Sequence, residues 1–206
     1  MYARSTTFEA NPDRIDAGIA YFCDEVMPAL STMGGYVGMS LLAHRESGRC
    51  ILTTAWEDSA AMQSSADRIP PLRDRAAEVL QASLSVDEWQ IAAVHREHHS
   101  HEGARVRATW LKIRPDQFDR AVEFYKTSVL PEIEQLEGFC SSSLMSDRGS
   151  GRVVVSVTYD SQDAMERNRE QARSLRTSLL RDLGADQQDV GEFELVIANL
   201  RVPEMA

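Results

Sequence analysis

The chain has 206 residues, of which 43% are hydrophobic and 26% are charged, a composition typical of a folded globular protein and not of a disordered one. Its formal net charge of −10 repels a phosphate backbone, so we expect no nucleic-acid partner. The sequence contains no run of 18 apolar residues and no apolar leader, so we expect neither a membrane partner nor secretion. The three scattered cysteines then indicate a reduced, cytoplasmic protein.

The second half of the sequence repeats the first half at an offset of 103 positions. Prolines, glycines and aromatic residues keep their order over most of this length, which chance matching would not preserve. The matching pairs include Pro12 and Pro115, Pro28 and Pro131, Gly35 and Gly138, Gly48 and Gly151, and Trp56 and Tyr159. We interpret the repeat as a tandem duplication.

Each copy is predicted to fold in the order strand, helix, strand, strand, helix, strand. The strands are expected near residues 3–10, 36–44, 50–56 and 89–94, and in the second copy near 105–113, 139–146, 153–159 and 193–198. The first helix of each copy begins at a Pro-Asp pair, and a later proline, Pro28 or Pro131, is expected to kink or end it. The second helices are expected near 59–84 and 162–183, with Pro70-Pro71 interrupting the former.

This order of elements is the ferredoxin-like βαββαβ motif, present twice, and it predicts the α+β fold class. A four-stranded sheet with both helices on one face leaves its other face to be covered. We therefore expect the two repeats to pack sheet-to-sheet as an intrachain pseudo-dimeric α+β barrel, and a further homodimer stays open. The repeats are placed at 1–95 and 104–206, joined by a histidine-rich linker at 96–103.

Two segments at the exit of the third strands, TTAWEDSAAM (53–62) and SVTYDSQDAM (156–165), resemble a signature of the antibiotic biosynthesis monooxygenase-like family of dimeric α+β barrels. The Pro-Asp helix starts and the Gly-aromatic pairs that open the second strands resemble the same family. The resemblance covers both copies and implies the barrel fold. It also implies one of the family's activities, which include cofactor-independent oxidation of polycyclic quinols and anthrones as well as haem degradation.

The residues themselves argue against haem. Thr6 and Thr109 stand where the haem-degrading members of the family carry an asparagine, and neither 62–84 nor 165–183 contains a histidine that could bind the iron. We therefore expect no cofactor.

A pocket between the helices and the sheet is the candidate site, and no catalytic residue is assigned. The ligand-pocket candidates are Arg4, Thr6, Phe8, Tyr21, His44, Trp56, Arg107, Thr109, Tyr125 and Tyr159. The arginines can stabilise a phenolate, and the histidine and two of the tyrosines, Tyr21 and Tyr125, can move a proton. The alternatives are solvent-exposed ion pairs for the arginines and core packing for the large aromatic residues. Copy one is expected to hold the ligand, because its Pro70-Pro71 break and its shorter third-strand side chains can open a cleft.

The only metal-like cluster along the sequence is formed by His95, His98, His99 and His101. No cysteine lies near it in the sequence, and acidic residues are sparse there. We interpret this segment as a solvated linker and predict no metal site.

Two hypotheses for the function follow. In the first, the protein binds an aromatic or polycyclic small molecule and oxidises it as a cofactor-independent monooxygenase. In the alternative, it is a non-catalytic protein that binds an apolar ligand or a partner on the same fold.

Overall fold

The computed structural model describes residues 1–205, and its strands occur at matching positions in the two halves of the chain. In the first half these strands are β1 (Tyr2–Glu9), β2 (Tyr36–His44) and β3 (Arg49–Trp56), and in the second half β5 (Arg105–Lys112), β6 (Phe139–Asp147) and β7 (Arg152–Tyr159). Their bounds coincide at the offset of 103 that relates the two halves of the sequence. The α+β class and the βαββαβ order are therefore confirmed. The tandem duplication fits these bounds and stays a prediction.

The last strand of each half is longer than expected, because β4 spans Ser83–Arg96 and β8 spans Asp186–Leu200. The prediction that the second helix continues to residue 84 is wrong, since this segment already belongs to β4. Hydrogen-bonded neighbours follow the order β1-β3-β2-β8-β5-β7-β6-β4, which is the order of a closed barrel. The expected α+β barrel is thus confirmed.

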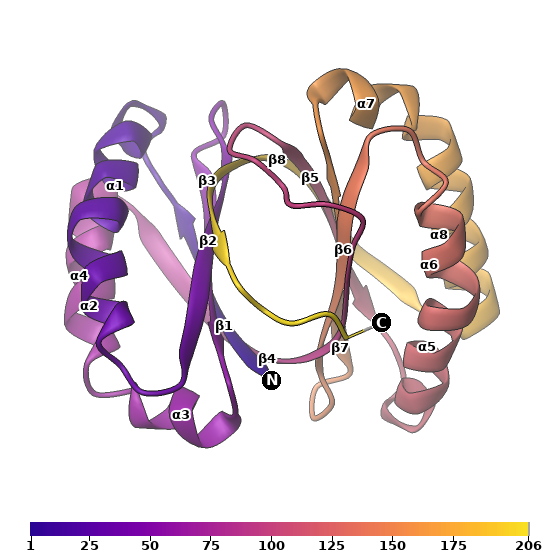
Figure 1. Cartoon of the computed structure of the whole chain (residues 1–206), viewed down its shortest axis with the longest axis horizontal. Coiled ribbons are helices and arrows are strands. Elements are labelled where there is room, and N and C mark those ends of the chain that lie inside the picture. Colours follow the sequence, from indigo (N-terminus) through magenta and orange to yellow (C-terminus); the bar gives the residue numbers. More distant parts are fainter. Residues whose placement is uncertain (206) are drawn as a thin grey trace. The chain divides into compact units, whose positions relative to one another are not determined.

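Contacts divide the chain into two compact units (Figure 1). Unit 1 contains Met1–Trp89 and Leu195–Val202, and unit 2 contains Gln90–Glu194 together with the residues from Pro203 onward. The predicted repeats at 1–95 and 104–206 are defined by sequence matches, whereas the two units are defined by contacts in the structure. The two divisions differ because β4 and β8 each run from one unit into the other.

In unit 1, helices α1 (Ile15–Tyr21), α2 (Met27–Ser31) and α4 (Ile69–Leu80) cover one face of the strands (Figure 1). A short helix, α3 (Ser59–Ser64), precedes α4. Pro70-Pro71 was expected to interrupt this second helix, but the pair lies in the first turn of α4, where proline is tolerated.

The break between the two pieces spans residues 65–68, and unit 2 has a break at Asn168, the equivalent of Ser65, without any proline. The prolines are therefore not required for it.

The first helix of each half contains a π-helical turn, at Phe22–Val26 and at Tyr125–Val129. These turns end directly before α2 and α6 (Leu130–Ile133), whose first turns contain Pro28 and Pro131. Because proline has no N–H group, the regular helical hydrogen bond cannot form there, and the wider turn accommodates the gap. The prediction that Pro28 and Pro131 disturb the first helix is confirmed, and the disturbance is a π-helical turn.

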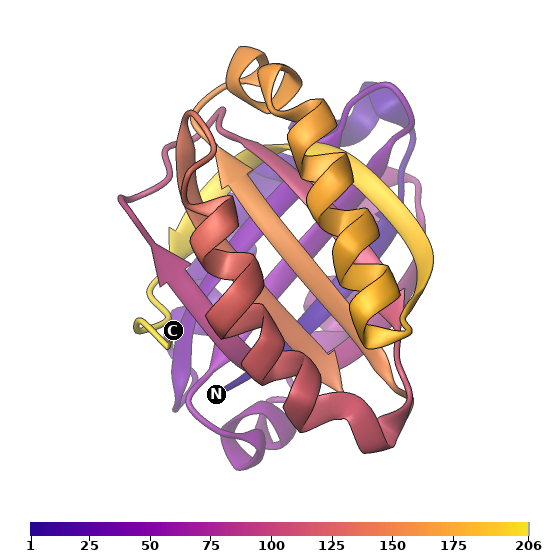
Figure 2. The ribbon, with the colours of Figure 1, turned by 90° about the vertical axis from the view of Figure 1, so that its right-hand side faces the viewer.

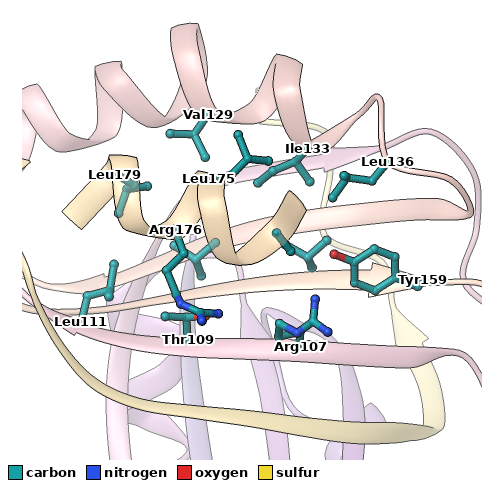
Figure 3. A pocket seen from close by; sticks show the side chains of 13 residues that line it. Arg107, Thr109, Leu111, Val129, Ile133, Leu136, Tyr159, Leu175, Arg176 and Leu179 are labelled. Atoms are coloured by element: carbon teal, nitrogen blue, oxygen red, sulfur yellow. The ribbon is translucent and has the colours of Figure 1, made fainter. Parts of the chain in front are cut away.

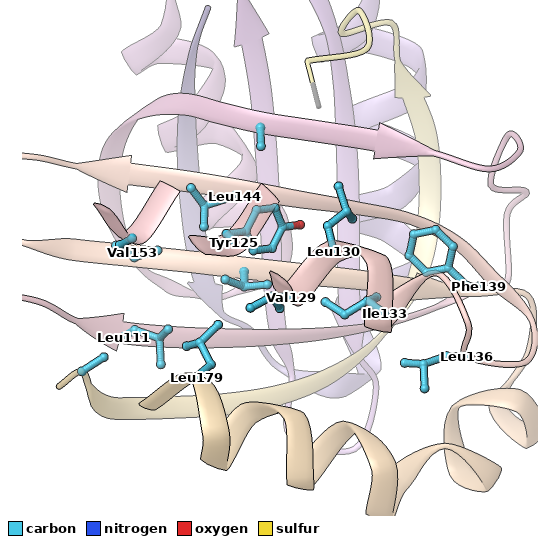
Figure 4. Close-up of a cluster of buried hydrophobic side chains, with 14 of the residues drawn as sticks. Leu111, Tyr125, Val129, Leu130, Ile133, Leu136, Phe139, Leu144, Val153 and Leu179 are labelled. Atoms are coloured by element: carbon cyan, nitrogen blue, oxygen red, sulfur yellow. The ribbon is translucent and has the colours of Figure 1, made fainter. Parts of the chain in front are cut away.

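In unit 2, helices α5 (Phe118–Phe124), α6 and α8 (Arg169–Leu183) lie over the strands, as Figure 2 shows, and α7 (Gln162–Arg167) leads into α8. Buried leucine, isoleucine and valine side chains from both layers meet between them (Figure 4). Full burial of each such side chain contributes about 1.5–3 kcal/mol, so this layer holds the helices on the sheet. Within the described part of the chain, no helix combines the length and the apolar character needed to cross a membrane.

Candidate functional site

A cavity of about 540 Å³ lies between the helices and the sheet of unit 2 (Figure 3). Its apolar walls are formed by Leu111, Val129, Ile133, Leu136, Val155, Val157, Ala172, Leu175 and Leu179. The polar side chains that line it are Arg107, Thr109, Tyr159 and Arg176. A mostly apolar pocket with a few polar groups is typical of a small-molecule site.

Arg107 projects from β5 and is held by an ion pair. Its side chain is only 6% exposed, its Nε donates to Glu192 Oε1 at 3.0 Å, and its Nη2 donates to the carbonyl oxygen of Met165 at 3.3 Å. Its Nη1 is also buried, but no group in residues 1–205 accepts a hydrogen bond from it. An unsatisfied buried donor costs about 1–3 kcal/mol. This nitrogen is therefore available to a ligand.

Arg176 reaches the cavity from α8 (Figure 3). Among the described residues, none forms a hydrogen bond or an ion pair with its guanidinium. Burial, followed by the positive charges of Arg107 and Arg173, lowers the pKa of Arg176, and Glu192 offsets part of this effect. Since the ordinary pKa of arginine lies above 12, the side chain stays charged at neutral pH. The cavity thus contains a positive charge without a direct counter-ion.

Tyr159 of β7 adds a hydroxyl group to the same cavity. The Cζ atom of Arg107 lies 5.8 Å from the centre of its ring, within the range of a cation–π interaction. Burial raises the pKa of Tyr159, and the charge of Arg107 together with its hydrogen-bonding interaction with the hydroxyl offsets part of the rise. The hydroxyl therefore remains protonated at neutral pH and can donate a hydrogen bond.

Unit 1 contains a smaller cavity of about 400 Å³ at the equivalent place. Two of its lining residues, Phe8 and Ile69, occupy the positions of Leu111 and Ala172 in unit 2. The bulkier pair accounts for the smaller space.

The arginines of unit 1 have more partners than those of unit 2. Arg4, which is 7% exposed, donates from Nε and Nη2 to Glu88 Oε1 at 3.1 and 2.8 Å and from Nη1 to Ser65 Oγ at 3.0 Å. Each nitrogen of its guanidinium therefore has an acceptor. Arg73, the counterpart of Arg176, forms a long ion pair in which its Nε lies 3.8 Å from Asp74 Oδ1, and this buried Nε has no hydrogen-bond acceptor among residues 1–205.

Two differences between the halves explain this contrast. Ser65 corresponds to Asn168, whose amide instead donates to two backbone carbonyls at 2.8 and 2.7 Å. Asp74 corresponds to Thr177, which carries no charge. The cavity of unit 2 therefore lacks the counterparts of Ser65 and Asp74, whereas Arg107 keeps an ion pair with a glutamate, as Arg4 does.

The structure brings together six of the side chains that the sequence marked as pocket candidates. Arg4, Thr6 and Phe8 line the cavity of unit 1, and Arg107, Thr109 and Tyr159 line that of unit 2. The alternative of solvent-exposed ion pairs is wrong for the two arginines, because their ion pairs with glutamates are formed by buried guanidinium groups. The expectation that copy one holds the ligand stays a prediction, since both units contain a cavity and that of unit 2 is the larger.

Four other candidates line neither of these two cavities. Tyr21 donates from its hydroxyl to a backbone carbonyl at 3.3 Å, and the fully buried Trp56 donates to a threonine hydroxyl at 3.1 Å. The hydroxyl of Tyr125 is 2.6 Å from Ser142 Oγ, and burial raises the pKa of this tyrosine. His44 lies at the hairpin after β2, where its Nδ1 contacts a serine hydroxyl at 2.9 Å. Packing and local hydrogen bonds occupy these groups.

Sequence reasoning missed Arg176 and the two glutamates that bind the buried arginines. A signal for Arg176 was present, because the offset of 103 places arginine at 73 and at 176 on the second helix of each copy. The glutamates are 84 and 85 positions from their arginines, and no local pattern connects them.

Haem does not fit the lining of either cavity. The described residues that form the two walls include no histidine, so no imidazole is present to bind the iron. This agrees with the absence of histidine from the sequence of both second helices.

Comparison with known proteins finds relatives that align with the whole of this chain. No protein-family model matches the chain. The uncharacterized protein Rv2558 of Mycobacterium tuberculosis is 59% identical over 206 residues, an alignment that covers 100% of this chain and 87% of the relative. The uncharacterized protein Rv2557 of the same organism is 56% identical over 205 residues, covering 100% of this chain and 92% of the relative.

Solved structures with low sequence identity share the fold. An anthrone oxidase-like protein has a TM-score of 0.69 at 13% identity, covering 100% of this chain and 94% of that one. The heme-degrading enzyme LmHde of Listeria monocytogenes has a TM-score of 0.55 at 10% identity, covering 94% and 99%. A ferredoxin fold protein related to antibiotic biosynthesis monooxygenases, also from Listeria monocytogenes, has a TM-score of 0.53 at 11% identity, covering 94% of each chain. The chain therefore belongs to one family with the two mycobacterial proteins, and its fold is that of the antibiotic biosynthesis monooxygenase-like dimeric α+β barrels.

Proposed function

We propose that the protein binds an aromatic or polycyclic small molecule carrying an acidic or phenolic oxygen, in the cavity of unit 2. The observation that supports this most directly is the pairing of two arginines with an apolar wall. Arg107 has a buried donor without an acceptor, and Arg176 has a charge without a direct counter-ion. An anionic oxygen placed between them would satisfy both groups, while the apolar side chains cover the rest of the ligand.

The electrostatics of this cavity contrast with those of the whole chain. The protein has a net charge of −10, so its general surface repels anions. An anionic ligand is therefore attracted only where positive charge is concentrated and shielded from the surrounding acids. Hydrogen bonds between charged groups contribute about 1.5–3 kcal/mol each, which is enough to select an anion over a neutral analogue.

A pair of fluorescent probes tests the proposal. The anionic probe 8-anilinonaphthalene-1-sulfonate and its uncharged analogue N-phenyl-1-naphthylamine have similar aromatic bodies and differ in charge. The variant Arg176→Ala is expected to weaken binding of the anionic probe by about 10-fold to 100-fold, the equivalent of one charge-assisted hydrogen bond. Binding of the neutral probe is expected to change little.

The chain offers a matched control in unit 1. Arg73→Ala removes the equivalent arginine next to the smaller cavity and should leave the affinity for the anionic probe unchanged. Equal losses in the two variants, or no loss in Arg176→Ala, would contradict the assignment to unit 2.

Oxygenation without a cofactor is the second candidate function, and the two arginines also favour it. Deprotonation makes a phenolic substrate electron-rich enough to pass electrons to O₂, and a phenolate is stabilised by adjacent guanidinium groups. In such a reaction the methylene group of an anthrone becomes a carbonyl, with one atom of O₂ incorporated and the other released as water. However, no histidine, aspartate, glutamate or lysine is found among the described lining residues, so binding has stronger support than catalysis.

Oxygen uptake separates the two candidates. Quinols and anthrones that bind with the expected dependence on Arg176 are incubated with the protein in air, with parallel anaerobic samples and protein-free controls. Uptake above the protein-free rate that is reduced in Arg176→Ala supports oxygenation. Binding without any such uptake leaves ligand binding as the function.

A further inference from the structure

A histidine, a cysteine and an aspartate side chain meet where the linker between β4 and β5 lies against β6. His98 lies in this linker, Cys140 is the second residue of β6, and Asp160 directly follows β7. The Sγ atom of Cys140 is 3.1 Å from Asp160 Oδ1, and the Nε2 atom of His98 is 3.6 Å from the same oxygen. All three ligand atoms lie within 4.8 Å of one another.

These separations fit a single tetrahedral metal ion. Zinc binds thiolate sulfur at about 2.3 Å and imidazole nitrogen or carboxylate oxygen at about 2.0–2.2 Å. Ligand atoms around such an ion are therefore about 3.3–3.6 Å apart. The two distances to the Asp160 oxygen are close to this range, so small side-chain rotations suffice to enclose an ion.

The surrounding hydrogen bonds orient the histidine. The Nδ1 atom of His98 is 3.3 Å from the carbonyl oxygen of His99, so this nitrogen can carry the proton and leave Nε2 as a ligand. The backbone N–H groups of Glu97 and His98 donate to the carbonyl oxygen of Cys140 at 2.9 and 3.3 Å. The linker is thereby fixed against β6 at the point where the ligands meet.

The cluster is specific to unit 2. The positions equivalent to Cys140 and Asp160 in the first half are Val37 and Glu57, and the apolar Val37 offers no ligand atom. The cluster is therefore not a consequence of the repeated fold.

We propose that His98, Cys140 and Asp160 bind a divalent metal ion of the zinc class, with water as the fourth ligand. The set of one nitrogen, one sulfur and one oxygen donor favours zinc over magnesium or calcium, which take oxygen ligands. A catalytic-type zinc site commonly has three protein ligands and one water. The site is separate from the cavity, because none of its three residues lines that space.

Cobalt binding to the untagged, chelator-treated chain tests this proposal. We expect one Co²⁺ ion per chain, an absorption band in the near ultraviolet from thiolate ligation, and loss of that band when Zn²⁺ is added. His98→Ala, which changes an exposed side chain, is expected to weaken binding by at least about tenfold. Cys140→Ser and Asp160→Asn should remove or weaken the band, with circular dichroism verifying that each variant is folded.

Neighbouring histidines provide the matched controls. His99→Ala and His101→Ala change exposed linker histidines outside the cluster and should leave the band and the affinity unchanged. Cobalt binding without a thiolate band, equal weakening in these controls and in His98→Ala, or no binding by the wild-type chain would each overturn the proposal. A rise in the thermal midpoint with Zn²⁺ in the wild type, absent in His98→Ala, is the expected independent result.

Discussion

Filling the cavity of unit 2 with the side chain that unit 1 already carries is expected to stabilise the protein and to block its ligand site. The change is Ala172→Ile, which copies Ile69 into the equivalent position of α8. Both residues line their cavities, and the cavity that contains alanine is the larger one, at about 540 Å³ against about 400 Å³. The new side chain therefore enters empty space that the fold is able to fill.

The expected gain follows from the added apolar groups. Isoleucine has three more carbon atoms than alanine, and at about 0.8 kcal/mol per buried CH₂ they contribute at most about 2.4 kcal/mol. Lost side-chain freedom and the lower helix propensity of a β-branched residue subtract about 1 kcal/mol. A net stabilisation of about 1 kcal/mol remains, which raises the thermal midpoint of a chain of this size by about 2–4 °C.

Urea denaturation measures the gain, and titration with 8-anilinonaphthalene-1-sulfonate measures the block. Ile69→Ala is the control, because it enlarges the cavity of unit 1 next to an arginine whose hydrogen bonds are already satisfied. This control should lose stability without gaining affinity for the probe. Wild-type affinity in a stabilised Ala172→Ile variant would refute the assignment, since a filled cavity cannot hold the same ligand.

Two further predictions concern backbone geometry and thiol reactivity. Gly151→Ala is expected to cost more than about 1 kcal/mol in urea denaturation, because Gly151 has a φ of +75° and a Cβ there would lie 2.4 Å from a backbone carbonyl oxygen. Gly149→Ala, in the same turn but without a positive φ, should cost much less, and equal costs would contradict the argument. At about pH 8 a disulfide reagent should react quickly with the exposed Cys23 alone, because burial raises the pKa of Cys50 to about 11 and that of Cys140 to about 12. Reagent counting before and after unfolding checks this, and rapid reaction of more than one thiol in the native chain would contradict it.

The parts of the fold that follow from local rules could be predicted from the sequence. Alternation along a strand has a period of two, so Arg4, Thr6 and Phe8 were expected on one face, and all three line a cavity. The positive φ of Gly48 and Gly151 in the two hairpin turns follows from a similarly local rule, because a tight turn imposes a requirement on its own residues. The repeat extended each local prediction to the other half.

The parts that depend on distant residues could not be predicted in this way. The linker histidines have no cysteine near them along the sequence and few acidic residues, yet the fold places Cys140 and Asp160 beside His98. The break in the second helix was assigned to the prolines because they are strong local signals. Unit 2 breaks at Asn168 without them, where the side-chain amide donates to the carbonyl oxygens of Ala164 in α7 and of Glu137 in the loop before β6.

Two equivalent buried arginines, Arg4 and Arg107, differ in how many of their nitrogens have a hydrogen-bond acceptor. In unit 1 every nitrogen of Arg4 has an acceptor, so the side chain serves the fold alone. In unit 2 the same fold leaves Nη1 of Arg107 without one, at a cost of about 1–3 kcal/mol that a single hydroxyl at position 168 would relieve, as Ser65 does in unit 1. A total stability of about 5–15 kcal/mol makes such a cost appreciable. The proposed anion site in unit 2 rests on this donor together with the adjacent charge of Arg176 and the apolar wall of the cavity, because a buried donor without an acceptor also occurs at Nε of Arg73 in unit 1.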